Sequence, residues 1–288
     1  MNMKTTLPPS GRIGAELSGL DARHMTPRDA EHVRELLYRH KLVIFRKQDL
    51  SKAEYVELAR KIGRPQIYFQ KNYQHPEHPE IFVSGNVPDE KGRKLGVAGT
   101  GRYWHTDYQF FEEPLPFVMV YPQVLPTTGR GTSFIDMEDV YARLPSELRD
   151  AVEGRNALQE GKWRYKVTPE DIDKAIVDIL AEVEKLVPPM WHPAVITHPV
   201  TKTKSLYVSR GFTTRIGELS KEPSDELLAK LLSFAERDEH VQTHTYEPGD
   251  ILLWENRRMV HMASASPKGE ASLSFRIGIY DDLPFYVK

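Results

Sequence analysis

Two histidines and one aspartate in this chain have the types and spacing of a metal site. His105 and Asp107 lie two positions apart. Residues i and i+2 of an extended strand project to one face, so this imidazole and carboxylate can chelate one cation. His261 follows far downstream, at the end of a strand-like segment that begins at Gly249. Two histidines and one carboxylate form a facial triad that suits non-haem Fe(II) oxygen chemistry.

A His-x-Asp pair can also arise by chance. The chain has 11 histidines and 41 acidic residues, so a surface histidine beside an aspartate is the alternative interpretation of the pair alone. The surrounding motifs decide between the two interpretations.

The composition is that of a globular protein and limits the possible metal donors. Of 288 residues, 40% are hydrophobic and 28% charged, and a net charge of -2 gives no basic field for nucleic acid. Because cysteine is absent, disulfides, thiolate zinc sites and iron–sulfur clusters are excluded. Residues 1–10 lack the apolar core of a signal peptide, and the apolar runs are too short to span a bilayer. We therefore expect a cytoplasmic protein without nucleic-acid or membrane partners.

The first third of the chain predicts a helix, a strand and a second helix. Apolar residues at positions 30, 33, 36 and 37 have helical spacing within 28–40, and Thr26-Pro27 precedes them as a cap and first turn. Residues 42–45 are a short apolar run typical of a buried strand. Ser51 and Glu54 form a capping box that opens a second helix, which ends at Gly63.

From residue 114 onward, short strand candidates alternate with turn residues. They cover 117–121, 132–135, 195–197, 205–208, 241–246, 251–254, 259–261 and 273–280, and helical patterns interrupt them at 137–153, 169–186 and 223–237. Many short strands separated by Pro and Gly favour a sandwich or barrel. We find no linker that divides the chain, so residues 1–288 are expected to form a single domain.

Several motifs taken together resemble the TauD/TfdA (taurine dioxygenase) family of Fe(II)- and 2-oxoglutarate-dependent oxygenases. Trp104-His105-Thr106-Asp107 is similar to its first metal motif, and 128–137 to its cosubstrate segment. The stretches 192–199 and 206–216 resemble its central region, and 249–261 followed by Arg276 its closing motif. The similarity runs from about residue 42 to residue 281. It implies a double-stranded β-helix (jelly roll) with flanking helices, and a requirement for Fe(II), 2-oxoglutarate and O₂.

The resemblance also suggests residues for the cosubstrate. The distal carboxylate of 2-oxoglutarate needs a buried cation, and Arg276 within an apolar strand offers a guanidinium fork of matching geometry. Thr132 is implied as a hydroxyl donor, while Trp254 and Asn256 are expected to hold His261 in place. The alternatives are a structural arginine paired with an acid, a threonine that bonds to the backbone, and a tryptophan that belongs to the core.

Within the family, the chain resembles the branch that forms isonitriles from N-carboxymethyl 3-amino acids in natural-product pathways. The resemblance rests on segment 71–84, on Tyr108 and on residues 130–132. It implies a substrate pocket lined by aromatic residues, which for any single ring competes with a place in the core. These residues are Tyr68, Phe69, Tyr73 and Tyr108.

The chain departs from that branch at two carboxylate donors. The branch has a Lys-x-Arg pair and a histidine four residues after the distal metal ligand, where this chain has Lys166-Val167-Thr168 and Ala265. Lys166 is retained, and Arg164 or Arg210 could hold the substrate carboxylate. The hypothesis is therefore an oxygenase of a small carboxylate-bearing, amino-acid-like substrate, with isonitrile formation as its sharpest version. Hydroxylation or desaturation of another small acid, and a catalytically silent jelly-roll binding protein, are the alternatives.

Overall fold

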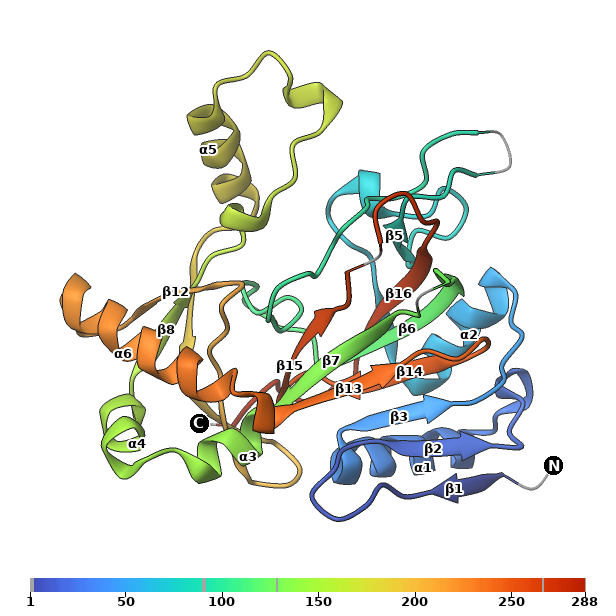
Figure 1. Ribbon diagram of the computed structural model, residues 1–288, viewed down its shortest axis with the longest axis horizontal. Coiled ribbons are helices and arrows are strands. Elements are labelled where there is room, and N and C mark those ends of the chain that lie inside the picture. Colours follow the sequence, from blue (N-terminus) through green and yellow to red (C-terminus); the bar gives the residue numbers. More distant parts are fainter. Residues whose placement is uncertain (1–2, 90–91, 128, 266, 288) are drawn as a thin grey trace.

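Two facing β-sheets with helices on their outer sides make up the body of the molecule (Figure 1). The structure is a computed structural model that describes residues 3–89, 92–127, 129–265 and 267–287. The arrangement is the mainly β jelly roll with flanking helices that the sequence predicts.

The larger sheet combines strands from both ends of the chain. Its order is β1 (Lys4–Thr6), β2 (Ala15–Ser18), β3 (Leu42–Phe45), β14 (Ile251–Glu255), β6 (Phe117–Val124), β16 (Leu273–Tyr280) and β4 (Arg64–Gln66), and β5 (Phe82–Gly85) also pairs with β16. All pairs are antiparallel except β2 with β3. The N-terminal segment is therefore an integral part of the sheet that carries Arg276.

The smaller facing sheet has the order β13 (Val241–Thr245), β7 (Gly131–Asp136) and β15 (Met259–Ala263). Two further antiparallel groups complete the strands: β12 (Thr213–Ile216), β8 (Asn156–Gln159) and β9 (Met190–Pro193), and the pair β10 (Val195–Thr197) and β11 (Lys204–Leu206).

Strict alternation along the strands separates the space between the sheets from the outer core. On β14, Ile251 and Leu253 pack toward the outer helices, whereas Leu252 and Trp254 face the smaller sheet. On β16, Phe275 and Ile277 belong to the outer core, so Arg276 between them points into the space between the sheets. The same alternation turns His261 on β15 inward, as described below.

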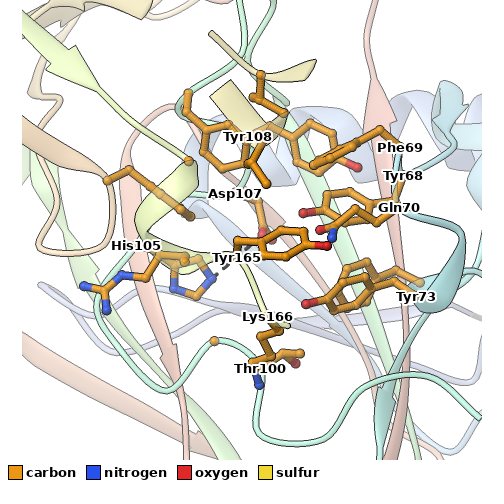
Figure 2. Close-up of a pocket in the computed structure, with 18 of the residues that line it drawn as sticks. Tyr68, Phe69, Gln70, Tyr73, Thr100, His105, Asp107, Tyr108, Tyr165 and Lys166 are labelled. Carbon is orange, nitrogen blue, oxygen red and sulfur yellow. Dashed lines mark ion pairs between the residues drawn. The ribbon is translucent and has the colours of Figure 1, made fainter. Parts of the chain in front are cut away.

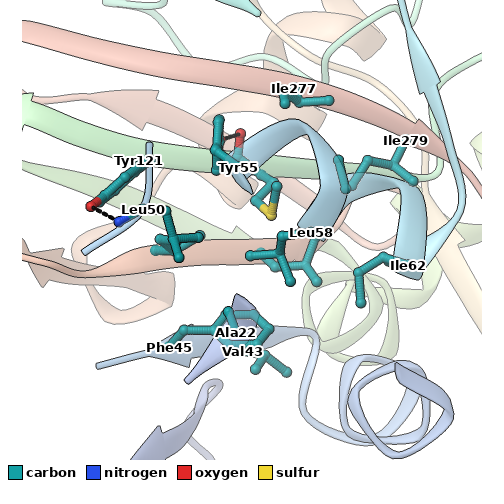
Figure 3. Close-up of a cluster of buried hydrophobic side chains, with 14 of the residues drawn as sticks. Ala22, Val43, Phe45, Leu50, Tyr55, Leu58, Ile62, Tyr121, Ile277 and Ile279 are labelled. Carbon is teal, nitrogen blue, oxygen red and sulfur yellow. Dashed lines mark hydrogen bonds between the residues drawn. The ribbon is translucent and has the colours of Figure 1, made fainter. Parts of the chain in front are cut away.

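The outer face of the large sheet is covered by α1 (Pro27–His40) and α2 (Lys52–Ile62). Both begin with the capping boxes expected from Thr26 and Ser51, whose side chains accept from the backbone N–H groups of Asp29 and Glu54. Figure 3 shows Tyr55, Leu58 and Ile62 of α2 among buried side chains of the large sheet, such as Val43 on β3 and Ile277 on β16. Burying an aliphatic side chain such as Leu58 here contributes about 1.5–3 kcal/mol. This packing holds the large sheet in place on its outer face, away from the smaller sheet.

The remaining helices are α3 (Met137–Arg143), α4 (Ser146–Val152), α5 (Ile176–Leu186) and α6 (Lys221–Ala235). Short 3₁₀ turns occupy η1 (Ala22–His24), η2 (Lys71–Tyr73), η3 (Lys162–Arg164), η4 (Pro169–Asp171) and η5 (Asp238–His240). Helices α3 and α6 pack on the outside of the smaller sheet, whereas α5 stands apart from the sheets (Figure 1). Within the described ranges, no helix is both long and apolar enough to cross a bilayer.

Two helical predictions differ from the structure. The pattern at 137–153 is broken into two helices, because Pro145 lacks the N–H that a continuous helix needs at that point. The pattern at 169–186 forms an α-helix only from Ile176, after a 3₁₀ turn at Pro169–Asp171. Sequence analysis also did not predict the short strands β1, β2, β4, β8, β9 and β12.

Candidate functional site

The side chains of His105, Asp107 and His261 converge on one point between the two sheets. All three are buried, and one potential ligand atom from each lies within 4.8 Å of the others. Nε2 of His105 is 3.8 Å from Oδ1 of Asp107, and Nε2 of His261 is 3.5 Å from Oδ2. Ligand bonds of about 2.0–2.2 Å to one ion place donor atoms at separations of this order. The three residues can therefore share a single metal ion.

The backbone brings the two histidines together directly. His105 and His261 exchange both of their backbone hydrogen bonds, at 3.1 and 2.8 Å. Residue 105 forms this isolated bridge to β15 instead of belonging to a regular strand. On β15, Met259 faces the space between the sheets and Val260 faces α6, so His261 points inward again.

The environment of His105 favours a neutral metal-binding imidazole. Its Nδ1 lies 2.7 Å from the carbonyl oxygen of Tyr103, so Nδ1–H donates there and the Nε2 lone pair faces the site. Burial, followed by the proximity of His261, lowers the pKa of His105 to about 3. Burial would raise the pKa of Asp107, but Arg276, His261 and His105 together outweigh it and hold this pKa below its usual range. The site therefore presents neutral nitrogen and anionic oxygen donors.

Two buried residues beside the triad support different members of it. The ring of Trp254 lies against His261, with centroids 4.7 Å apart. The amide of Asn256 instead donates to the carbonyl oxygens of Asp107 at 2.8 Å and Leu115 at 3.0 Å. Asn256 thus fixes the backbone of Asp107, whereas the sequence assigned it to His261.

Arg276 reaches the carboxylate of the triad. Its Nη1 donates to Oδ1 of Asp107, and its guanidinium lies 3.9 Å over the ring of Phe82. Its head group is therefore next to the metal position. The distal carboxylate of 2-oxoglutarate is two methylene groups beyond the keto acid end, so a second cation deeper in the site would suit it better.

Arg130 is such a cation, and sequence analysis assigned it no role. It lies in a cavity of about 80 Å³ that also borders Thr132, Tyr246 and the triad histidines. Only 9% of Arg130 is exposed, its Nη1 donates to Ser272 at 3.1 Å and Ser274 at 3.4 Å, and its Nε has no partner. Among the described residues no carboxylate lies within ion-pair distance of it. A buried guanidinium without a counter-ion is a site for an anion.

The same cavity carries a pair of hydroxyl groups. Oγ1 of Thr132 and the hydroxyl of Tyr246 are hydrogen-bonded to one another, and both residues are buried. Thr132 therefore lies where the sequence placed it, while Tyr246 was missed. Arg130 could have been found from its spacing to Thr132, since residues two positions apart face the same way in an extended chain.

A second pocket adjoins the triad and is walled by aromatic rings (Figure 2). The four rings that the sequence suggested all line it: Tyr68, Phe69, Tyr73 and Tyr108. Tyr68 is at their centre, with ring centroids 5.2 Å from Tyr73 and 5.6 Å from Tyr108. Tyr108 directly follows Asp107 and has a left-handed φ of 60°, a strained conformation for a non-glycine residue. That conformation turns the chain immediately after the metal motif.

The three basic residues suggested for the substrate occupy different places. Lys166 lines the aromatic pocket, where its Nζ donates to the carbonyls of Ala98 at 2.6 Å and Gly99 at 2.9 Å. Arg164 also lines it, with its guanidinium 4.2 Å over the ring of Tyr103. Arg210 lies outside this pocket, because Glu236 holds its guanidinium in an ion pair of 2.8 Å at the surface.

With this geometry established, similarity to known proteins is informative. Residues 5–276 match the family described as "Taurine catabolism dioxygenase TauD, TfdA family". Pentalenolactone F synthase of Streptomyces arenae is 30% identical over 97% of this chain and 96% of its own length. The alpha-ketoglutarate-dependent 2,4-dichlorophenoxyacetate dioxygenase of Cupriavidus pinatubonensis is 26% identical over 81% of this chain and 82% of its own length.

A solved structure of a taurine dioxygenase from Burkholderia xenovorans has the same fold. It superposes with a TM-score of 0.77 at 25% sequence identity, covering 98% of this chain and 90% of that one.

Proposed function

This chain belongs to the TauD, TfdA family, and we propose that His105, Asp107 and His261 hold the Fe(II) of its 2-oxoglutarate-dependent dioxygenase activity. The donor set fits that ion, since two imidazoles and one carboxylate form a facial triad. Oδ2 of Asp107 is moreover buried without a hydrogen-bond partner. When bound, Fe(II) supplies the O₂ chemistry that couples decarboxylation of 2-oxoglutarate to oxidation of a second substrate.

We propose that the cavity beside Arg130 receives 2-oxoglutarate. Arg276 is close enough to Asp107 to neutralise the cosubstrate carboxylate nearest the metal. Arg130, which has no counter-ion, pairs with the distal carboxylate, and the hydroxyls of Thr132 and Tyr246 donate to it. The observation that carries this assignment is the buried, unpaired guanidinium of Arg130.

An anaerobic binding experiment tests both assignments. Adding Fe(II) and then 2-oxoglutarate should produce a weak metal-to-ligand charge-transfer absorption band. His261→Ala should abolish this band and the formation of succinate. Undiminished succinate from a folded His261→Ala protein would remove His261 from the metal site.

For the second substrate we propose a small carboxylate-bearing, amino-acid-like molecule. Lys166 carries this proposal, since its ammonium group lines the aromatic pocket and donates to the neutral carbonyls of Ala98 and Gly99 rather than to an acid. Burial, Arg102 and Lys94 together lower the pKa of Lys166, so a substrate carboxylate would relieve an unfavourable charge. The surrounding rings suit a short apolar chain or an amine.

Isonitrile formation from an N-carboxymethyl 3-amino acid is the specific version of this proposal. Conversion of an N-carboxymethyl amine into an isonitrile releases CO₂ and removes four hydrogen atoms, a four-electron oxidation. Two molecules each of 2-oxoglutarate and O₂ are therefore consumed per product. Lys166 and the tyrosine-lined pocket agree with what the resemblance to that branch implies.

Hydroxylation or desaturation of a different small acid is the second candidate. Two features favour it: Thr168 and the exposed Ala265 stand where the isonitrile branch has carboxylate donors. A relative at 30% identity is moreover named pentalenolactone F synthase and not an isonitrile-forming enzyme. Either reaction consumes one 2-oxoglutarate per oxidation step.

Product identity and stoichiometry distinguish the two candidates. Incubation with N-carboxymethyl 3-aminoalkanoic acids, followed by mass spectrometry, should give an isonitrile and two succinates for each product. One succinate and an alcohol that retains the carboxymethyl carbons would leave hydroxylation only.

We further propose that residues 1–288 act as one catalytic domain. The large sheet combines β1–β3 from the N-terminal end with β14 and β16 from the C-terminal end, and β16 supplies Arg276. Neither end can then be removed without dismantling the sheet that carries the site.

A further inference from the structure

A third cavity lies beyond Arg130, on its solvent side. Its volume is about 260 Å³, and it shares the two residues Ser84 and Arg130 with the cosubstrate cavity. Arg130 therefore stands in the wall between an inner and an outer space. We call the outer space the basic opening, defined by Arg102, Arg130 and Lys268 together with Ala98 and Asn86.

The aromatic pocket adjoins the cosubstrate cavity from another side. Phe82, Thr100 and Gly101 line both of them, whereas Ser84 and Arg130 border only the cosubstrate cavity and the basic opening. The metal position can thus be approached along two routes. One route passes the rings around Tyr68, and the other passes Arg130.

The two routes differ in charge. Arg102, Arg130 and Lys268 line the basic opening, and its described lining contains no aspartate or glutamate. Arg102 is exposed, and among the described residues neither it nor Lys268 has a carboxylate within ion-pair distance. The aromatic pocket also carries cations, Arg164, Lys166 and Arg276, but it contains the carboxylate of Asp107 and is walled mainly by aromatic rings. A dianion that entered there would lose more of its hydration before it was paired, and desolvating an unpaired charge is costly.

We propose that 2-oxoglutarate enters and succinate leaves through the basic opening, with Arg130 as the last cation on the way to the metal site. This inference rests on the proposed cosubstrate site at Arg130. Arg102 and Lys268 attract the dianion and raise its rate of encounter. The aromatic pocket is left to the second substrate, so the cosubstrate can exchange while that substrate remains bound.

Association kinetics test the role of charge. The anaerobic Fe(II)-loaded protein is mixed with 2-oxoglutarate, and the rise of the charge-transfer band is followed at several salt concentrations. The double variant Arg102→Glu/Lys268→Glu should slow association about tenfold and weaken its dependence on salt, because surface charges act mainly on the association rate. Lys71→Glu, a reversal beside the aromatic ring of Phe69, should change the rate less than about twofold.

If Lys71→Glu slowed association of 2-oxoglutarate as much as the double variant does, the rate would depend on overall charge and not on the basic opening. That result would overturn the inference. An unchanged rate in the double variant would overturn it as well. If the unsubstituted protein formed no band at all, the proposed cosubstrate site itself would be refuted, which is a different outcome from a normal band with an unaltered rate.

Steric blocking provides a second test that does not depend on charge. Ala98 is exposed and lines the basic opening, so Ala98→Trp should narrow it. Association and dissociation of 2-oxoglutarate should then slow by the same factor, which leaves the Kd unchanged. The matched variant Gln70→Trp obstructs the aromatic pocket and should leave both rates within about twofold of the unsubstituted protein. The reverse pattern would establish entry through the aromatic pocket and overturn the proposal.

Discussion

The guanidinium of Arg276 donates through Nη1 to Oδ1 of Asp107, so the cation lies against the carboxylate of the metal triad. The position follows from the alternation on β16, which turns Arg276 inward between Phe275 and Ile277. In the proposed binding mode, Arg276 is near the keto acid end of 2-oxoglutarate and Arg130 meets the distal end. The two arginines are thus expected to contribute separately to cosubstrate binding.

Replacing Arg276 should weaken cosubstrate binding more than metal binding. Arg276→Met removes a charge-assisted contact of about 1.5–3 kcal/mol, so the Kd for 2-oxoglutarate should rise about 10- to 100-fold. Arg276→Lys keeps the charge but loses the forked guanidinium geometry. Its Kd for 2-oxoglutarate should therefore lie between those of the unsubstituted protein and Arg276→Met. Anaerobic titration of the charge-transfer band measures the Kd. An unchanged Kd in Arg276→Met would leave Arg276 only its contact with Asp107.

Removing the amide of Asn256 should destabilise the protein and loosen the metal site together. Asn256→Ala leaves the buried carbonyls of Asp107 and Leu115 without their side-chain donor, at a cost of about 1–3 kcal/mol. Urea unfolding of the metal-free protein measures that cost, and competition with a chelator measures Fe(II) affinity. Loss of stability with unaltered Fe(II) affinity would show that Asn256 supports the fold without positioning Asp107.

The pairing of His105 with Asp107 could be proposed from the sequence because the two residues are close neighbours, although the chain turns at Asp107 instead of continuing as the expected strand. His261 lies far downstream and is singled out by the resemblance of residues 249–261 to the closing motif of the family. The capping boxes at Thr26 and Ser51 are local, and both form. The capping boxes and the His105–Asp107 pair depend on neighbours within four residues, so a single sequence contains them.

Arg130 shows what the sequence could not supply. An arginine beside glycine in a polar turn resembles a surface residue, and its burial depends on Ser272 and Ser274, more than 140 positions away. Arg210 is the opposite case, since only the distant Glu236 on the C-terminal side of α6 draws it away from the pocket. Contacts with residues distant in the sequence determine where both arginines lie, and hydrophobic periodicity carries no information about such contacts.

Arg130 should govern affinity for the distal carboxylate of 2-oxoglutarate. Arg130→Met should raise the Kd about 10- to 100-fold, since one charge-assisted pair is lost. Removing a buried cation that lacks a counter-ion should leave stability unchanged or higher. Arg143→Met is the matched control, because Arg143 pairs with Asp139 at the surface. Tight 2-oxoglutarate binding by Arg130→Met would return the distal carboxylate to Arg276.

Lys166 should act on the second substrate alone. Lys166→Met removes a cation from the aromatic pocket and should raise KM for an N-carboxymethyl 3-aminoalkanoic acid about tenfold or more, the effect of one charged contact. The charge-transfer titration with 2-oxoglutarate should be unaltered, since Lys166 does not line the cosubstrate cavity. An equal loss of 2-oxoglutarate affinity in Lys166→Met would show that Lys166 does not act on the second substrate alone.

A buried ion-pair cluster behind the metal site should make stability depend on acid. Glu255 is fully buried, accepts from Nε2 of His198 at 2.7 Å, and lies 2.5 Å from Nε of Arg258. Burial would raise the pKa of Glu255, but Arg258 and His198 outweigh it and lower this pKa from 4.5 to about 2. The stabilisation is therefore fully present above pH 4.5 and is lost as the pH falls from there toward about 2.

Glu255→Gln tests this dependence. At pH 7 it should lower the free energy of unfolding by about 3 kcal/mol, because Arg258 loses its buried partner and keeps only the partly exposed Glu138. As the pH falls below 4.5, the unsubstituted carboxyl also becomes neutral, so the difference between the two proteins should shrink. Urea unfolding across that range measures it, with Glu222→Gln at the N-terminal end of α6 as the exposed control. A difference that stays constant down to the lowest pH at which both proteins fold would mean that Glu255 stabilises the fold by its shape and hydrogen bonds, and not by its charge.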